Sequence, residues 1–137
     1  MGINIWHVVI ASVLAMGLGG LWYGPVLFGR QWMKVIGIDE NDHEKIKQGQ
    51  REAGPLYTIQ FVLVLIQTAL LSVLLRDTFH ISTLVYVILA WAAFVIPTLA
   101  GSVMWTNDTK EIKWLRFWIQ AGYQFVLFIM FGIVLSW

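Results

Sequence analysis

The sequence predicts an all-α fold: a polytopic membrane protein whose four transmembrane helices form a bundle, with one short amphipathic helix on the cytoplasmic side. Four apolar stretches, at residues 5–28, 56–75, 84–104 and 117–137, contain no Asp, Glu, Lys or Arg. A hydrocarbon core of about 30 Å requires about 20 apolar residues as a helix, and each stretch is long enough. Charged residues make up 12% of the chain, about half the share of an average soluble domain.

The chain length fits one such bundle without a separate soluble domain, so we expect residues 1–137 to form a single four-span domain. The first stretch lacks the positive start and cleavage site of a secretory signal, and we expect it to be retained. Cysteine is absent, which excludes disulfides and thiolate metal sites, and no other pattern indicates a cofactor. The net charge of +1 indicates no nucleic-acid partner. The expected partner is the lipid bilayer.

Positive charge is distributed unevenly between the links that join the four stretches. Eight of the nine Lys and Arg residues lie in the loops at 29–55 and 105–116, and only Arg76 lies between the second and third spans. Because cytoplasmic loops carry the excess of Lys and Arg, these two loops are predicted to be cytoplasmic. The sequence therefore predicts a multi-pass protein of the cell membrane with both termini outside.

The first span ends in a segment rich in glycine. Small residues at four-residue spacing clear a helix face so that another backbone can approach closely. Pro25 lacks an N–H and predicts a kink or a break, and Gly29 suits a C-terminal cap. Two interpretations stay open: a tightly packed, kinked helix, or a discontinuous helix whose freed carbonyls line a binding cavity. The candidate packing and kink positions in this span are Gly17, Gly19, Gly20, Gly24, Pro25 and Gly29.

The third span carries a similar pattern, with Pro97 followed four residues later by Gly101. Pro25 and Gly29 have the same spacing, and a charged loop and a span with two glutamines follow each pair. This echo suggests two helical hairpins related by a pseudo-two-fold axis along the membrane normal.

The loop at 29–55 contains the candidate short helix. Its acids precede its bases between residues 39 and 48, an order that complements the helix macrodipole. Asp39 is the candidate N-cap and Gly49 the candidate C-cap. Gly54–Pro55 is expected to break the chain before the second span.

Neutral polar residues, and no carboxylates, lie inside the spans. An intramembrane acid would be needed for proton-coupled multidrug transport, and the four stretches offer none. Amide side chains in lipid seek partners across helix interfaces, contributing about 0.6–2 kcal/mol each. They therefore either join helices or line a polar cavity for a small solute or a lipid headgroup. The candidate cavity residues are Gln60, Gln67, Gln120, Tyr123 and Gln124.

His7 and His80 are predicted to lie on the same outer side of the membrane. Imidazole pairs ligate haem or metals, so a shared site is one interpretation. No spacing motif accompanies the pair, which favours ordinary interfacial histidines.

One segment resembles a known family. The run from Gly20 to Pro25, with Phe28–Gly29 and Trp32–Lys34 after it, is similar to the signature of the prokaryotic membrane family catalogued as domain of unknown function 1761. The segments at 91–94 and 122–137 resemble its later spans. Gly24 stands where many relatives carry Ser, and Ala92–Ala93 replaces a Leu-Gly pair. The resemblance implies a small four-span protein and brings no activity, substrate or catalytic residue.

The expected function is that of a non-catalytic scaffold or partner-binding protein that forms homo-oligomers, because small-residue stripes and neutral amides suit helix association. The alternative is a small-solute transporter or channel assembled from four-span units. A third class, a haem-, quinone- or lipid-processing enzyme, rests only on the two histidines and the glutamines. A small-molecule or lipid ligand is compatible with the second and third classes.

Overall fold

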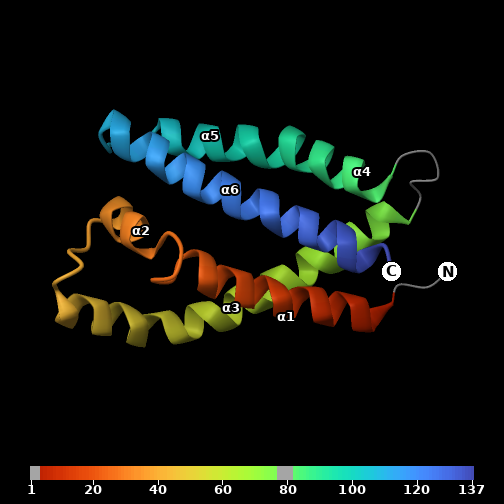
Figure 1. The fold of residues 1–137 in the computed structure, drawn as a ribbon, viewed down its shortest axis with the longest axis horizontal. Helices are drawn as coiled ribbons and strands as arrows, with labels where there is room; N and C mark the ends of the chain where they lie inside the picture. Colours follow the sequence, from red (N-terminus) through yellow and green to blue (C-terminus); the bar gives the residue numbers. More distant parts are fainter. Residues whose placement is uncertain (1–3, 77–81) are drawn as a thin grey trace.

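The computed structural model describes residues 4–76 and 82–137, and all regular structure in these two ranges is helical (Figure 1). Four helical units are long and apolar enough to cross a membrane: α1, α3, the continuous α4–η1–α5, and α6. The predicted all-α fold class is confirmed. The elements are α1 Ile5–Trp22, α2 Gly29–Ile36, α3 His43–Leu75, α4 Thr83–Ala90, the π-helix η1 Trp91–Val95, α5 Ile96–Met104 and α6 Lys110–Leu135.

Each of these four units begins with a polar capping residue. The side chains of Asn4, Asp42, Ser82 and Thr109 each accept a hydrogen bond from a backbone N–H two or three residues further on. These bonds satisfy N–H groups that have no partner within the first helical turn. A polar side chain therefore caps the start of each unit.

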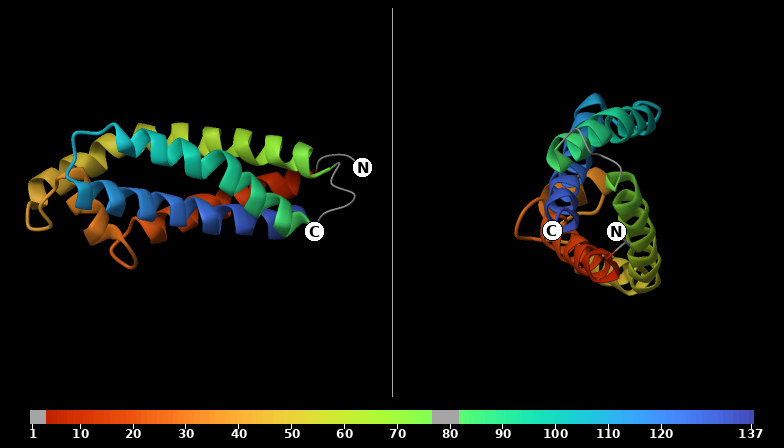
Figure 2. Two further views of the ribbon diagram at one scale, coloured as in Figure 1. Left: turned by 90° about the horizontal axis from the view of Figure 1, so that it is seen from above. Right: turned by 90° about the vertical axis from the view of Figure 1, so that its right-hand side faces the viewer.

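At one end of the bundle, the start of α1 and the end of α6 lie close together (Figures 1 and 2). We call this the packed end. Ser12 and Thr68 are fully buried there, with their hydroxyl oxygens 3.4 Å apart. Each hydroxyl donates to the carbonyl of the residue four positions earlier, so neither leaves a donor unpaired. The core at this end consists of Ala11, Ala15, Val64, Leu71, Val87, Leu127, Phe128 and Phe131.

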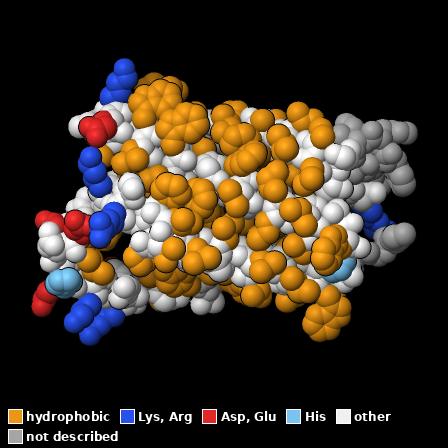
Figure 3. Space-filling view, viewed as in Figure 1, with side chains coloured by type: hydrophobic (Ala, Val, Ile, Leu, Met, Phe, Trp, Pro, Cys, Tyr) orange, Lys and Arg blue, Asp and Glu red, His pale blue; other side chains and the backbone are white. Residues whose placement is uncertain are grey.

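At the opposite end, which we call the splayed end, α3 diverges from α6, and α2 packs against α6 (Figure 1). In the bundle α3 packs against α1, α1 packs against α6, and α6 packs against α4, α5 and α2. Most of the charged side chains in view gather at this end (Figure 3). The segments at 29–55 and 105–116 therefore lie at the same end of the molecule (Figure 1).

The first span is shorter than predicted. Helix α1 ends at Trp22, and a turn carries the chain past Pro25 into α2. The N–H of Phe28 donates to the carbonyl of Trp22 and that of Gly29 to the carbonyl of Gly24, both at 2.9 Å. The prediction that Gly29 caps this span is wrong, because Gly29 is the first residue of α2. A Cβ at Gly29 would lie 2.5 Å from the Gly24 carbonyl oxygen, so only glycine fits.

The expected separate helix at 39–48 and the break at Gly54–Pro55 are also wrong. Helix α3 continues without interruption from His43 to Leu75, and its N-cap is Asp42 instead of Asp39. Gly49 therefore lies inside a helix. Pro55 removes one helical hydrogen bond, but its neighbours in α3 are largely exposed, so the freed carbonyl is not enclosed in an apolar core. The short amphipathic helix of this chain is α2, which buries Val35 and exposes Arg30 and Lys34.

Pro97 does not repeat the local structure around Pro25. Pro97 lies in α5 just after the π-helix, in which the N–H of Ile96 donates to the carbonyl of Trp91 five residues earlier. A wider turn of this kind relieves the clash between a proline ring and the carbonyl four residues before it. Pro25 follows a helix end, whereas Pro97 lies within a continuous helical unit. The predicted similarity between the first and third spans is therefore absent from the local structure around the two prolines.

Candidate functional site

A cavity of about 900 Å³ lies at the splayed end, between the second half of α1, the following turn, α2, α3 and α6. Its lining runs from Ala15 near the middle of α1 to the exposed Arg30 and Glu40. The cavity is therefore open where the charged residues gather. We call it the main cavity.

Glycines of the first span form one wall of the main cavity. A Cβ at Gly20 would meet no atom within 4 Å, whereas one at Gly19 would lie 3.3 Å from the Tyr123 hydroxyl oxygen. The absence of side chains here leaves room that another residue type would fill. Gly17, Pro97 and Gly101 are not among the lining residues, and a Cβ at Gly17 or Gly101 would meet open space. The lining residues from the predicted set are Gly19, Gly20, Gly24, Pro25 and Gly29.

Polar side chains reach the main cavity from two helices that face each other. Gln60 comes from α3, while Gln120, Tyr123 and Gln124 come from α6. The Oε1 atom of Gln124 is buried and has no hydrogen-bond partner among the described residues, although buried polar atoms are usually paired. The Tyr123 hydroxyl lies 3.4 Å from the carbonyl oxygen of Ala15. Gln67, also predicted for a polar cavity, does not line this one.

Several lining residues were not selected from the sequence. The ring of Tyr23 packs against Trp32 and Tyr123, at centroid distances of 4.9 and 5.3 Å. Arg30 and Glu40 form an exposed ion pair of 3.6 Å at the opening. Charged residues outside the apolar stretches usually lie on a solvated surface, so the sequence did not indicate a role for this pair. The turn after α1 brings Arg30 to the cavity. The other residues missed are Ala15, Met16, Met33, Ile46, Gln50, Tyr57 and Leu99.

Two tryptophans fix α6 beside the main cavity. The Trp22 indole N–H donates to the carbonyl of Ile119 at 3.0 Å, and that of Trp91 to the carbonyl of Ala121 at 3.2 Å. Gly122 permits the first contact, because a Cβ there would lie 3.1 Å from the Trp22 ring. Neither of these two bonds was predicted from the sequence.

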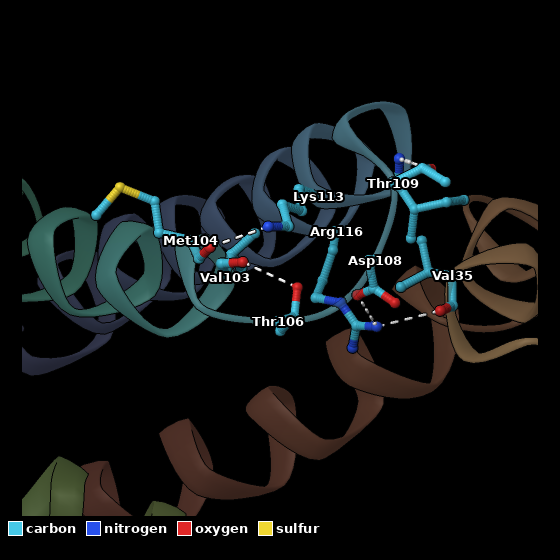
Figure 4. A network of polar contacts seen from close by, with 9 residues as sticks. Val35, Val103, Met104, Thr106, Asp108, Thr109, Lys113 and Arg116 are labelled. Atoms are coloured by element: carbon cyan, nitrogen blue, oxygen red, sulfur yellow. Dashed lines mark hydrogen bonds and ion pairs between the residues drawn. The ribbon is translucent and has the colours of Figure 1, made fainter.

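A polar network holds α2 against the start of α6 (Figure 4). The Nη2 atom of Arg116 donates to the Asp108 carboxylate at 2.8 Å and to the Val35 carbonyl at 3.2 Å. Lys34 forms a second, exposed link of 3.2 Å to Glu111. Since α2 supplies part of the cavity lining, this network helps to set the shape of the opening.

The main cavity offers hydrogen-bonding groups that are neutral near pH 7, together with one ion pair at its opening. Amides and phenols donate and accept hydrogen bonds, which suits binding and orienting a polar molecule. The described residues hold no group of three or more His, Asp or Glu placed to bind a metal ion. The predicted partner of His7, His80, lies outside the described residues, so a shared site stays a prediction.

Fold and site together define a small all-α protein with four helices long and apolar enough for a membrane and a polar cavity at one end. The chain belongs to the family described as Protein of unknown function (DUF1761), whose profile matches residues 6–136. It matches no curated protein and no solved structure. The family match confirms the resemblance drawn from the glycine-rich segment and assigns no activity.

Proposed function

We propose that this protein is an integral membrane protein that binds a small polar molecule in the main cavity and transports it. The observation that carries this proposal is the convergence of α3 and α6 amides on a space of about 900 Å³ with a glycine wall. Such a volume lies in the range of small-molecule sites. Amides that only joined helices would be paired with each other, whereas the Gln124 oxygen has no partner among the described residues. The geometry therefore favours the transporter alternative over a purely structural scaffold.

The lining defines the class of solute. Amide and phenol groups complement uncharged polar groups, and the adjacent opposite charges of Arg30 and Glu40 complement a zwitterion at the opening. A solute with net charge would find no fixed counter-charge deeper in the cavity, since the deeper polar side chains are Gln and Tyr. The proposed solute is therefore neutral or zwitterionic.

One-sided access supports transport. The main cavity is open at the splayed end, while at the packed end the side chains of Ser12, Thr68 and Phe131 have 0% exposure. Alternating-access transporters expose a site to one side of the membrane at a time. In this proposal, the structure represents the state that is open at the splayed end.

We further propose that the splayed end faces the cytoplasm, because eight of the nine Lys and Arg residues lie in the two loops that meet there. The natural absence of cysteine makes single-cysteine labelling direct. Gln48→Cys is expected to react with a membrane-impermeant maleimide only after cells are permeabilised, and Ser136→Cys in intact cells. The reverse pattern would contradict this orientation.

Cavity filling tests the proposed site. In Gly20→Phe a ring enters the main cavity, and in Gly17→Phe a ring enters open space three residues away on the same helix. Native mass spectrometry of protein released from its own membrane is expected to show a defined small mass on the wild type. That mass should be lost from Gly20→Phe and kept by Gly17→Phe. A wild type without any retained mass, or equal retention by both variants, would overturn the proposal.

The homo-oligomeric scaffold remains a second candidate because of Gly17. This residue is exposed, and a Cβ there would meet nothing within 4 Å. No other described helix of the same chain therefore packs closely against Gly17. A second copy could pack there. The same spectra test this, since a shift of Gly17→Phe toward monomer would support the scaffold and an unchanged mass distribution would remove it.

A further inference from the structure

A second, smaller cavity of about 250 Å³ lies where α5 ends and α6 begins. Its lining shares no residue with that of the main cavity. Its lining surface is almost wholly apolar and includes two lysines of α6; we call the apolar side chains its floor and the lysines its rim. We call it the α5–α6 groove. Its residues used below are Val103, Met104, Phe117 and Trp114 for the floor and Lys110 and Lys113 for the rim.

The two rim lysines carry uncompensated charge. Neither Lys110 nor Lys113 forms an ion pair with any residue that the structure describes. Lys113 donates to the carbonyl of Met104 at 3.0 Å, which holds its ammonium group over the end of α5 (Figure 4). The positive end of the α6 dipole lies at the same place. The two acids of this segment are already paired, Asp108 with Arg116 and Glu111 with Lys34.

Aromatic residues place the rim at headgroup depth. Trp105, Trp114 and Trp118 are 86%, 51% and 64% exposed, and all three lie around the start of α6. Exposed tryptophans concentrate at the level of lipid headgroups, with hydrocarbon on one side and water on the other. In the proposed membrane position, the rim lysines therefore lie at phosphate depth and the floor continues toward the acyl chains.

We propose that the α5–α6 groove binds one anionic phospholipid, with its phosphate on Lys110 and Lys113 and an acyl chain against Val103, Met104 and Phe117. Basic pockets between helices on the cytoplasmic side are suited to anionic headgroups. A zwitterionic lipid fits less well, because no free carboxylate at the rim can hold its amine. A free phosphate would leave the apolar floor uncovered. This inference rests on the proposed membrane insertion and not on the main cavity.

The test uses the full chain in nanodiscs of equimolar phosphatidylglycerol and phosphatidylcholine, followed by native mass spectrometry of the released protein. The wild type is expected to retain one phosphatidylglycerol in preference to phosphatidylcholine. The double variant Lys110→Gln/Lys113→Gln should retain about 25-fold less, since each of the two basic residues near an anionic surface contributes on the order of fivefold. The control Lys45→Gln/Lys47→Gln removes the same charge from exposed positions of α3 and should retain as much as the wild type.

A third variant tests the floor. Ala100→Phe fills the α5–α6 groove, of which Ala100 is also part, without changing charge, and is expected to lower lipid retention. Equal retention of both lipids by the wild type, or an equal loss in both lysine double variants, would overturn the proposal. Full displacement of phosphatidylglycerol by inorganic phosphate would identify a free-anion site instead. Gly20→Phe should leave lipid retention unchanged, which separates failure here from failure of the proposed transport site.

Discussion

Replacing Arg116 by Met is expected to loosen α2 without unfolding the bundle. The guanidinium holds two partners, the Asp108 carboxylate at 2.8 Å and the Val35 carbonyl at 3.2 Å. The Arg116 and Asp108 side chains are 24% and 29% exposed, so water weakens the pair only in part. Met keeps a similar length and loses every donor.

The magnitude follows from the burial of these contacts. Hydrogen bonds to charged groups contribute about 1.5–3 kcal/mol, and partial exposure reduces the sum here to about 1–3 kcal/mol. At about 1.4 kcal/mol per factor of ten, local opening of α2 becomes about 5- to 150-fold more frequent. The Lys34–Glu111 pair is 61% and 78% exposed, and its loss in Lys34→Met should change opening by about twofold at most.

Hydrogen–deuterium exchange of residues 29–36 in detergent measures this difference. Exchange is expected to accelerate strongly in Arg116→Met and hardly in Lys34→Met, while the core of α6 keeps its protection. Equal exchange rates in Arg116→Met and the wild type would refute the assignment of Arg116 as the residue that anchors α2. Uniform acceleration along the whole chain would show global destabilisation instead.

Two further predictions concern packing beside α6. Gly132→Ala should lower the free energy of unfolding by about 1–3 kcal/mol, because its Cβ would lie 2.9 Å from a Val87 methyl group in the core. Trp22→Phe should lower it by about 0.5–1.5 kcal/mol, since the bond to the Ile119 carbonyl is lost. Denaturant titration in mixed micelles measures both changes.

Matched controls isolate these two effects. Gly17→Ala adds a methyl group in open space and should be neutral or slightly stabilising, because alanine favours helix more than glycine does. Trp105→Phe alters a side chain that is 86% exposed and should leave unfolding unchanged. An equal loss of unfolding free energy in Gly17→Ala and Gly132→Ala would contradict the Val87 contact as the cause. An equal loss in Trp105→Phe and Trp22→Phe would contradict the Trp22 hydrogen bond as the cause.

The sequence predicted the helical units better than their ends. Uninterrupted apolar stretches of this length predict helices, because a backbone in lipid must satisfy its hydrogen bonds within its own segment. The break predicted at Gly54–Pro55 was wrong because glycine and proline disfavour a helix only through local propensity. A long helix tolerates one missing hydrogen bond where the freed carbonyl is not buried. Asp39 and Asp42 are equally suitable caps by type, and the observed fold selects Asp42.

The main cavity was predictable only in part. Gln60, Gln120 and Gln124 stand out as polar residues in apolar helices, whereas Gln67 has the same signal and lies elsewhere. Which amides share a space depends on how α3 diverges from α6, and no local pattern encodes that divergence. Arg30 reaches the opening only through the turn after α1, whose path depends on the close backbone approach at Gly29.

The unbroken α3 has a mechanical consequence. Its buried Thr68 lies against Ser12 of α1, with the hydroxyl oxygens 3.4 Å apart, and from Thr68 to His43 the helix is about 37 Å long at about 1.5 Å per residue. With Thr68 as the pivot of this lever arm, a tilt of about 5° displaces the His43 end by about 3 Å. Sub-ångström repacking around one buried hydroxyl pair is thus amplified into a change of about one atomic diameter in the width of the distant opening.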